Sequence, residues 1–319
     1  MIAQSSECRG WSDRSTDGVI GVRSRRFLLL ASVSLFLTCC YAGEPASAPG
    51  EPIRVLFIGN SYTICNDMPA MFAELMRASG HAVEVASSAR GGWTLAHHAA
   101  SEQTLGILES QSWDYVILQE QSVIPCLPDR REQAMYPAVR ALHGSIQRAG
   151  PETVLFVTWG RRDGLASEGD RDFEVMQDQL YAGYKEIADE IGAAMAPVGI
   201  AWQRARTEDS ALELWDKDGS HPSREGSYLA ACVFYSVICR ASPERTNYRG
   251  GLPRGTAQFL QRVAAETMWD WGARTPHDET SWKRRHLPMR AALADLHAEP
   301  TTPPSVSCVS AGHPRPSLA

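Results

Sequence analysis

The chain has 319 residues, of which 44% are hydrophobic and 21% are charged, with a formal net charge of −6 and a pI of about 5.9. This is the composition of an ordinary globular protein with room for one sizeable core. The acidic balance argues against a phosphate-tracking nucleic-acid surface, which needs clustered Lys and Arg. We therefore expect one folded domain with tails and no nucleic-acid partner.

Residues 1–42 have the layout of a leader with a secretory signal peptide. A basic segment precedes the apolar run Phe27–Thr38, and small residues follow it. This order is typical of a secretory signal, and the run is too short to be a comfortable bilayer span. We expect cleavage after Ala42 and an exported protein, periplasmic or extracellular, with no membrane-spanning segment after processing. Cys40 is an alternative site for a lipid anchor.

After a linker over 43–51, short apolar runs alternate with amphipathic stretches across 52–272. The apolar runs predict five strands, namely Ile53–Ile58, Ala82–Ala86, Tyr115–Leu118, Val154–Thr158 and Ala194–Pro197. The amphipathic stretches predict helices at Met68–Ser79, Leu95–Glu109, Arg131–Arg148, Arg171–Ile191, Arg224–Ile238 and Thr256–Trp271.

This alternation of strand and helix indicates a parallel sheet, because parallel neighbours need crossover connections. The predicted fold is α/β: a doubly wound, five-stranded parallel sheet inside a three-layer α/β/α sandwich. The polar, Pro-rich C-terminal tail over 273–319 is expected to add nothing to the core.

Four cysteines fall in the predicted domain, at positions 65, 126, 232 and 239. No two are spaced as C-x-x-C, so a zinc or thioredoxin site has no support. Cys232 and Cys239 lie in an apolar helical stretch and are expected to be buried thiols. Cys65 and Cys126 each follow a strand end, and an exported enzyme could pair them; two separate thiols fit the sequence equally well.

A polar segment follows each predicted strand. In an open parallel sheet, the functional crevice lies outside the carboxyl ends of the strands. The segments delivered to that edge are Gly59-Asn60-Ser61, Ser88–Thr94, Gln119–Ser122, Trp159–Gly164 and Asp216–Ala231. The last of them holds Asp218 and His221 three residues apart, directly before a predicted helix.

These segments contain all the parts of a serine hydrolase site. The chemistry needs a nucleophile, a base, a carboxylate that orients the base, and donors for the oxyanion. Ser61 can attack, His221 can take its proton, and Asp218 can accept from the other imidazole nitrogen. The candidate oxyanion donors are the backbone N–H groups of Ser61 and Gly92 and the side-chain amide of Gln119 or Gln121.

The same residues have ordinary structural interpretations. A lone serine after a glycine is commonly a turn former or a helix cap, and Ser61 alone is best explained that way. Asp218-Gly219 is a turn dipeptide, and Pro222 with Ser223 suits a helix start. What favours chemistry is that several functional-looking loops converge on one sheet edge.

Other side chains near this edge carry weaker signals. Trp93, Trp159 and Arg161 suit a sugar or carboxylate group, although capping aromatic residues and solvated arginines explain them equally well. His97 and His98 are adjacent on a helix and point in different directions, so we expect surface or rim histidines and no metal. A nucleotide site has no P-loop lysine and no G-x-G-x-x-G, and no G-x-S-x-G indicates an α/β-hydrolase elbow.

Four motifs carry a resemblance to a known superfamily: "FIGNSYT", "DYVILQEQS", "TWGRRDG" and "DGSHPSREGSYLAA". Their order from about Ile53 to Trp271 resembles the SGNH (GDSL-like) hydrolases, and more narrowly a bacterial branch with Gln-Glu-Gln-Ser in the third loop. The resemblance implies a flavodoxin-like fold and ester hydrolysis without metal or other cofactor. It also implies Ser61 as the nucleophile, with Asp218 and His221 completing the site.

The third loop departs from the superfamily pattern, because the usual oxyanion asparagine is missing. Gln121 is the first candidate to replace it and Gln119 the second, while Glu120 suits a structural acceptor. The expected function is an exported serine esterase that removes a small acyl group, acetyl-sized, from a carbohydrate or another small polar molecule. The alternatives are a lipid or thioester acyl hydrolase, and a non-catalytic carbohydrate-binding protein on the same scaffold.

Overall fold

The computed structural model describes residues 51–165 and 172–274. The expected leader with Cys40, nearly all of the linker, and the tail from residue 275 lie outside the described residues. Within the two described ranges, no helix combines the length and the hydropathy that a bilayer span requires.

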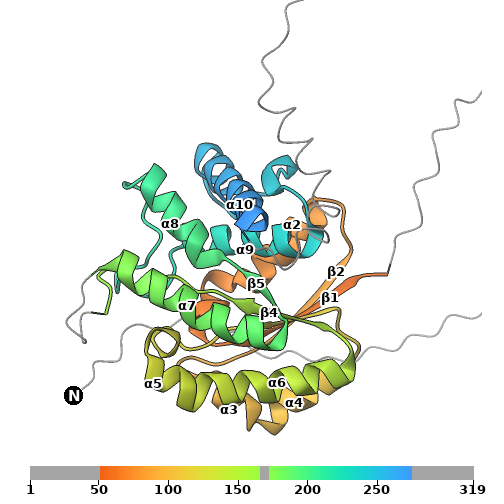
Figure 1. The fold of residues 1–319 in the computed structure, drawn as a ribbon. Helices are drawn as coiled ribbons and strands as arrows, with labels where there is room; N and C mark the ends of the chain where they lie inside the picture. Colours follow the sequence, from red (N-terminus) through yellow and green to blue (C-terminus); the bar gives the residue numbers. More distant parts are fainter. Residues whose placement is uncertain (1–50, 166–171, 275–319) are drawn as a thin grey trace, which may run out of the picture.

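A five-stranded parallel sheet forms the centre of the molecule, with the strand order β2-β1-β3-β4-β5 (Figure 1). Its strands are β1 (Ile53–Gly59), β2 (Val83–Ala89), β3 (Tyr115–Leu118), β4 (Glu152–Phe156) and β5 (Ala194–Ala196). The run Val55–Ile58 in β1 is fully buried, as expected for a strand covered on both faces. The chain moves to one side of β1 for β2 and to the other for β3, so a crevice opens at the carboxyl end of β1.

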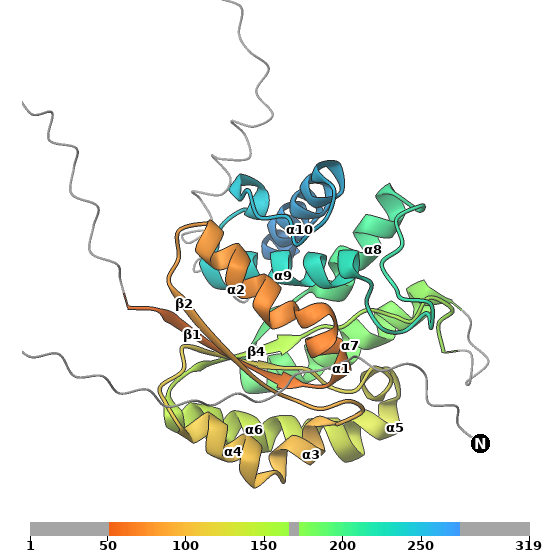
Figure 2. The same ribbon diagram turned by 180° about the vertical axis from the view of Figure 1, so that it is seen from behind.

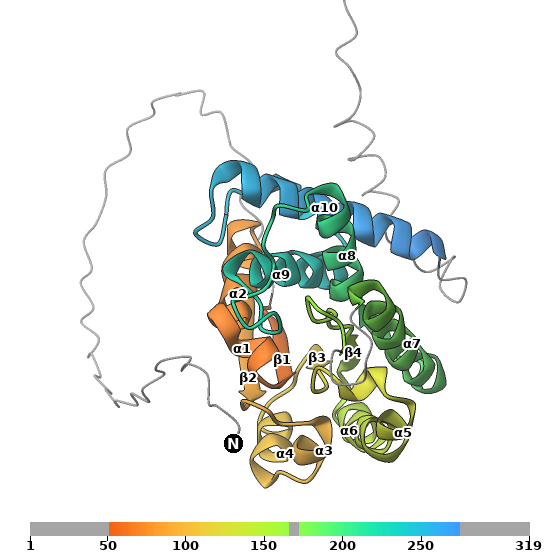
Figure 3. The same cartoon turned by 90° about the vertical axis from the view of Figure 1, so that its left-hand side faces the viewer.

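Helices cover both faces of the sheet (Figures 1 and 2). One face carries α2 (Met68–Ala78), α8 (Val198–Glu208) and α9 (Arg224–Cys239), with α10 (Arg254–Arg274) packed on α8 and α9. The other face carries α3 (Leu95–Ala99), α4 (Glu102–Glu109), α6 (Tyr136–Ala149) and α7 (Phe173–Ile191). Seen from the side, the three layers are distinct (Figure 3). The predicted three-layer α/β/α sandwich is confirmed.

Two predicted helices differ from the structure in their detail. The stretch Leu95–Glu109 forms two helices, because Ser101 starts the second one by accepting a hydrogen bond from the Thr104 N–H at 3.3 Å. The stretch from Arg131 begins with a π turn, Arg131–Met135, before α6; the short α5 (Pro128–Arg130) precedes it.

Three of the four cysteines of the domain are buried in the structure. Cys65 and Cys126 are both buried and do not form a disulfide with each other. The Cys126 thiol instead faces the carbonyl of Met176 at 3.9 Å. Cys232 is fully buried, as expected, whereas Cys239 is only partly buried.

Candidate active site

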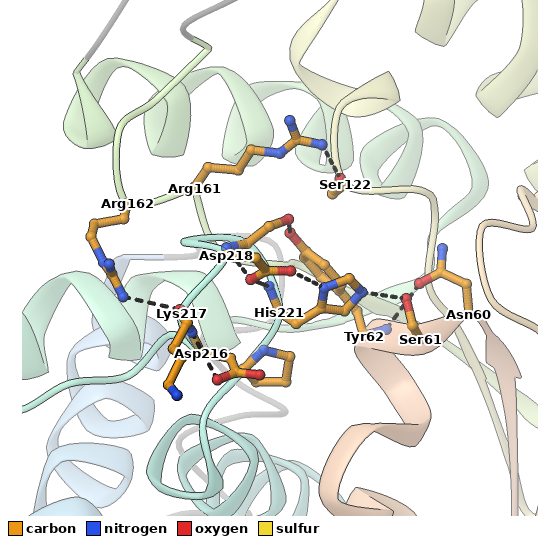
Figure 4. Close-up of polar contacts among 12 residues, drawn as sticks. Asn60, Ser61, Tyr62, Ser122, Arg161, Arg162, Asp216, Lys217, Asp218 and His221 are labelled. Atoms are coloured by element: carbon orange, nitrogen blue, oxygen red, sulfur yellow. Dashed lines mark hydrogen bonds and ion pairs between the residues drawn. The ribbon is translucent and has the colours of Figure 1, made fainter. Parts of the chain in front are cut away.

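Ser61, His221 and Asp218 form a hydrogen-bonded chain at the carboxyl edge of the sheet (Figure 4). Ser61 Oγ lies 2.8 Å from His221 Nε2, and His221 Nδ1 lies 2.5 Å from Asp218 Oδ2. When Nδ1–H donates to the carboxylate, Nε2 is left to accept the serine proton. This is the order of groups that an activated serine nucleophile requires.

Ser61 is the first residue of α1 (Ser61–Ile64), directly after β1, but it does not cap that helix. Asn60 does so, because its Oδ1 accepts from the Tyr62 N–H at 3.1 Å. The Asn60 amide also donates to the Trp93 carbonyl at 2.9 Å, which ties the first loop to the second. The structural interpretation of Ser61 as a helix cap is therefore wrong, and its hydroxyl is directed to His221 instead.

Close packing at Gly59 fixes the backbone just before the nucleophile. A Cβ at this position would lie 2.4 Å from Thr63 Oγ1 and 2.5 Å from Gln119 Oε1, so any larger residue would have to displace these side chains. These two atoms bond to each other at 2.9 Å, and Gln119 Oε1 also accepts from the Asn60 N–H at 2.8 Å. The first and third loops are thus held together beneath Ser61.

The loop that carries the base is a tight turn closed by Asp218 itself. Its Oδ1 accepts from the N–H groups of Ser220 and His221, each at 2.9 Å. Partial burial acts to raise the pKa of Asp218, but the bonds from the His221 ring and from these two N–H groups outweigh it and lower that pKa. The side chains of Asp218 and His221 are 34% and 37% exposed, so a substrate can reach them.

An aromatic stack supports this loop from below. The Tyr62 and Trp159 rings are parallel at 4.7 Å, and Trp159 stacks on Trp202 at 4.2 Å. Trp159 Nε1 donates to the Ser220 carbonyl at 3.0 Å, and the Tyr62 hydroxyl lies 2.6 Å from the Ser220 hydroxyl. Trp159 is fully buried, so the expectation that it contacts substrate is wrong; it positions the loop that carries His221.

The two glutamines of the third loop, Gln119 and Gln121, differ in burial and in their hydrogen bonds. Gln119 is only 1% exposed, and its amide nitrogen donates to the Glu120 carbonyl while its oxygen serves the first loop. The expectation that Gln119 donates to an oxyanion is therefore wrong. Gln121 is partly exposed; its Oε1 accepts from the Val123 N–H at 2.9 Å, and its Nε2 lies 3.4 Å from Ser122 Oγ.

Glu120 is the structural acceptor that the third loop was expected to contain. It is fully buried and accepts from the Gln121 N–H at 2.6 Å and from the Leu95 N–H at 3.2 and 3.3 Å. Burial raises its pKa to about 7, although these two N–H groups oppose that shift. One carboxyl group therefore joins the third loop to the start of α3.

The second loop brings Gly92 to the same edge. Gly92 has a φ of 74°, and the turn around it is closed by a hydrogen bond from the Trp93 N–H to the Arg90 carbonyl at 3.0 Å. The Trp93 ring is partly exposed, and the Arg90 guanidinium lies 5.3 Å from its centre. Because Trp93 also accepts from Asn60, this loop lies against the residue that precedes Ser61.

Comparison with known proteins decides the family. No family model matches the sequence, and no curated protein is similar to it. A DUF4886 family protein from Bacteroides uniformis is 20% identical in sequence, with a TM-score of 0.61. The match covers 69% of this chain and 95% of the Bacteroides chain, which shows that the two share a fold. A candidate SGNH hydrolase from Slackia heliotrinireducens is 32% identical with a TM-score of 0.51, over 59% of this chain and 99% of its own. The chain belongs to the SGNH hydrolase superfamily. The expectation that the chain is a hydrolase is confirmed with it.

Asn66 is a part of this SGNH hydrolase that the sequence motifs missed. Its Nδ2 lies 2.9 Å from the Pro222 carbonyl, 3.0 Å from the Ser223 carbonyl and 2.9 Å from Ser227 Oγ. The side chain thus holds the segment that directly follows His221. Its left-handed backbone, with φ of 57°, is one that asparagine tolerates better than most residues.

The two adjacent histidines of the SGNH hydrolase have separate structural roles. His97 is exposed and caps α3. His98 is buried, so the expectation of a surface or rim position is wrong for it. Its ring nitrogens lie 2.7 Å from the Gly59 carbonyl and 2.9 Å from Thr104 Oγ1, and burial lowers its pKa. Among residues 51–165 and 172–274, no group of three or more His, Cys, Asp or Glu side chains is placed to hold a metal.

Proposed function

We propose that this SGNH hydrolase is a serine esterase that removes a small acyl group, acetyl-sized, from a carbohydrate or a similar polar alcohol. The observation that carries the proposal is the continuous chain from Ser61 Oγ through His221 to Asp218. Ser61 attacks the ester carbonyl while His221 takes its proton, and His221 then gives that proton to the departing alcohol. Water, activated by the same imidazole, releases the acid from the acyl-enzyme.

Oxyanion stabilisation falls to the backbone N–H groups of Ser61 and Gly92, with the Gln121 side chain as the third donor. The Gln121 amide is held by its Oε1, which accepts from the Val123 N–H at 2.9 Å, while its Nε2 makes only a long contact of 3.4 Å to Ser122 Oγ, so an Nε2–H is available to the oxyanion. One such donor is worth about 10²–10³ in rate. Gln121 therefore takes the role that asparagine has in the commoner third loop.

A small acyl group and a polar alcohol agree with the surroundings of Ser61. The loops at this edge are polar, and the partly exposed Trp93 with Arg90 over its ring is a combination that suits a sugar. Two cavities elsewhere, of about 720 and 340 Å³, are lined by residues of other segments. Neither is lined by Ser61, Asp218 or His221. Export, inferred from the leader, remains part of the proposal.

Trapping with a fluorophosphonate probe tests the nucleophile. The adduct, located by mass spectrometry, is expected on Ser61 and absent from Ser61→Ala. Ser110→Ala, at the exposed end of α4, removes a hydroxyl far from the site along the chain and is the matched control. An adduct on another serine would refute the mechanism.

Turnover of 4-nitrophenyl acetate and 4-nitrophenyl decanoate tests the acyl length. The proposal expects higher kcat/KM for the acetate and its loss in Ser61→Ala. A preference for the decanoate would favour a lipid acyl hydrolase instead. Absence of turnover together with retained glycan binding would favour a non-catalytic carbohydrate-binding protein.

A further inference from the structure

Arg161 carries a positive charge beside the site that no carboxylate balances within the described residues. It lies in the loop after β4 and is partly buried. Its Nη2 donates to Ser122 Oγ at 3.2 Å, while its Nε is buried without a hydrogen-bond partner. The adjacent Arg162, by contrast, forms an ion pair with Glu213 at 3.2 Å.

The position of Arg161 links it to the substrate crevice. Its side chain reaches from the loop after β4 to Ser122 in the loop after β3 (Figure 4). Burial raises the pKa of Tyr62, and the charge of Arg161 is among the influences that oppose this rise. The Tyr62 ring in turn packs edge-on against His221 at 5.6 Å.

A partly buried guanidinium that lacks an anion is costly, because it has lost hydration without gaining a charged partner. Its planar fork has five N–H donors and matches the two oxygens of a carboxylate. Among the guanidinium donors, only Nη2 has an acceptor within the described residues, in Ser122. Nε is buried and cannot reach a ligand, so the donors that remain for one are the Nη1 N–H groups and the second N–H of Nη2, which have no acceptor among residues 51–165 and 172–274.

We infer that Arg161 binds a carboxylate on the substrate, so that the enzyme prefers esters that carry a negative charge near the scissile bond. This inference rests on the proposed esterase function. The charge could belong to the alcohol, as in an acylated sugar acid, or to the acyl group, as in the half-ester of a dicarboxylic acid. Both sources present the same chemistry to the guanidinium.

Two pairs of esters separate these sources. On the alcohol side, 3-acetoxybenzoate is compared with the neutral 3-acetoxybenzamide; on the acyl side, 4-nitrophenyl hydrogen adipate is compared with 4-nitrophenyl hexanoate. The wild-type enzyme should prefer the anionic member of one pair. Arg161→Ala should lower the ratio of kcat/KM, anionic over neutral, about 10- to 100-fold, as expected for a charge-assisted hydrogen bond. Arg161→Lys, which keeps the charge but not the fork, should give an intermediate ratio.

Arg130→Ala is the control, because it removes one positive charge from an exposed position on α5 and should keep the wild-type ratio. Fluorophosphonate labelling of Ser61 in Arg161→Ala shows that the variant has folded. The inference is overturned if the wild-type enzyme prefers neither anionic ester, or if Arg161→Ala lowers both members of a pair equally. If Ser61 is not labelled in the wild-type enzyme and no ester is hydrolysed, the proposed function itself is refuted.

Discussion

Replacing Glu120 by glutamine is expected to change how the stability of the domain depends on pH. Burial raises the pKa of Glu120 to about 7 from its ordinary value of 4.5. Between these values the folded protein holds a proton that the unfolded chain has released, so stability falls as the pH rises through this window. At about 1.36 kcal/mol per pH unit, the gap corresponds to about 3 kcal/mol lost from the free energy of unfolding.

Urea unfolding of the wild-type protein and Glu120→Gln at pH 4.5, 6 and 8 measures this effect. Glutamine cannot titrate, and any packing cost that it adds is the same at each pH. Between pH 4.5 and 8, the free energy of unfolding of the variant should therefore rise by about 3 kcal/mol relative to that of the wild type. Glu109→Gln, at the exposed end of α4, controls for the loss of one carboxylate and should not reproduce the trend. The reasoning would be refuted if the free energies of unfolding of the wild-type protein and Glu120→Gln differed by the same amount at all three pH values.

Three further changes test the support around the site. Asp218→Asn should lower kcat about 10⁴-fold, since His221 would lose the partner that fixes its tautomer; an unchanged kcat for 4-nitrophenyl acetate would argue against the assigned roles. Asn66→Ala should lower the free energy of unfolding by about 1–3 kcal/mol, because three contacts to the segment after His221 are lost; equal urea midpoints and slopes would contradict this. Gly59→Ala should cost about 1–3 kcal/mol through overpacking against Thr63, and an unaltered thermal midpoint would show that the neighbours give way.

The fold was predictable because its strands are apolar runs of the right length between helical patterns. Tyr115–Leu118 was predicted to the residue, since polar residues bound it at both ends. The strand predicted at Val154–Thr158 is displaced by two residues, since β4 spans Glu152–Phe156. Val157 and Thr158 are buried like strand residues, and the Val157 N–H still donates to the Ala196 carbonyl at 3.0 Å. Phe156 is nevertheless the last residue with a register partner in β5. Burial therefore continues beyond the residue at which strand pairing stops.

The candidate site was predictable only as far as the sheet edge determines it. Ser61, Asp218 and His221 follow strands or precede a helix at that edge, and the structure has them within hydrogen-bonding distance. The sequence could not show that Gln119 turns back to the first loop, or that Trp159 lies inside an aromatic stack. Both depend on neighbours that are distant along the chain.

The bond between Ser61 and His221 joins residues 160 positions apart, so the site assembles only when the last strand–helix unit has docked. Contacts of such long range form after the chain has paid the entropy of closing the loop. A molecule that has folded its first strand and helix already displays the serine but has no base to activate it. Titration of Ser61 with a fluorophosphonate would therefore count completely folded molecules, and so measure the quality of a preparation independently of its total protein content.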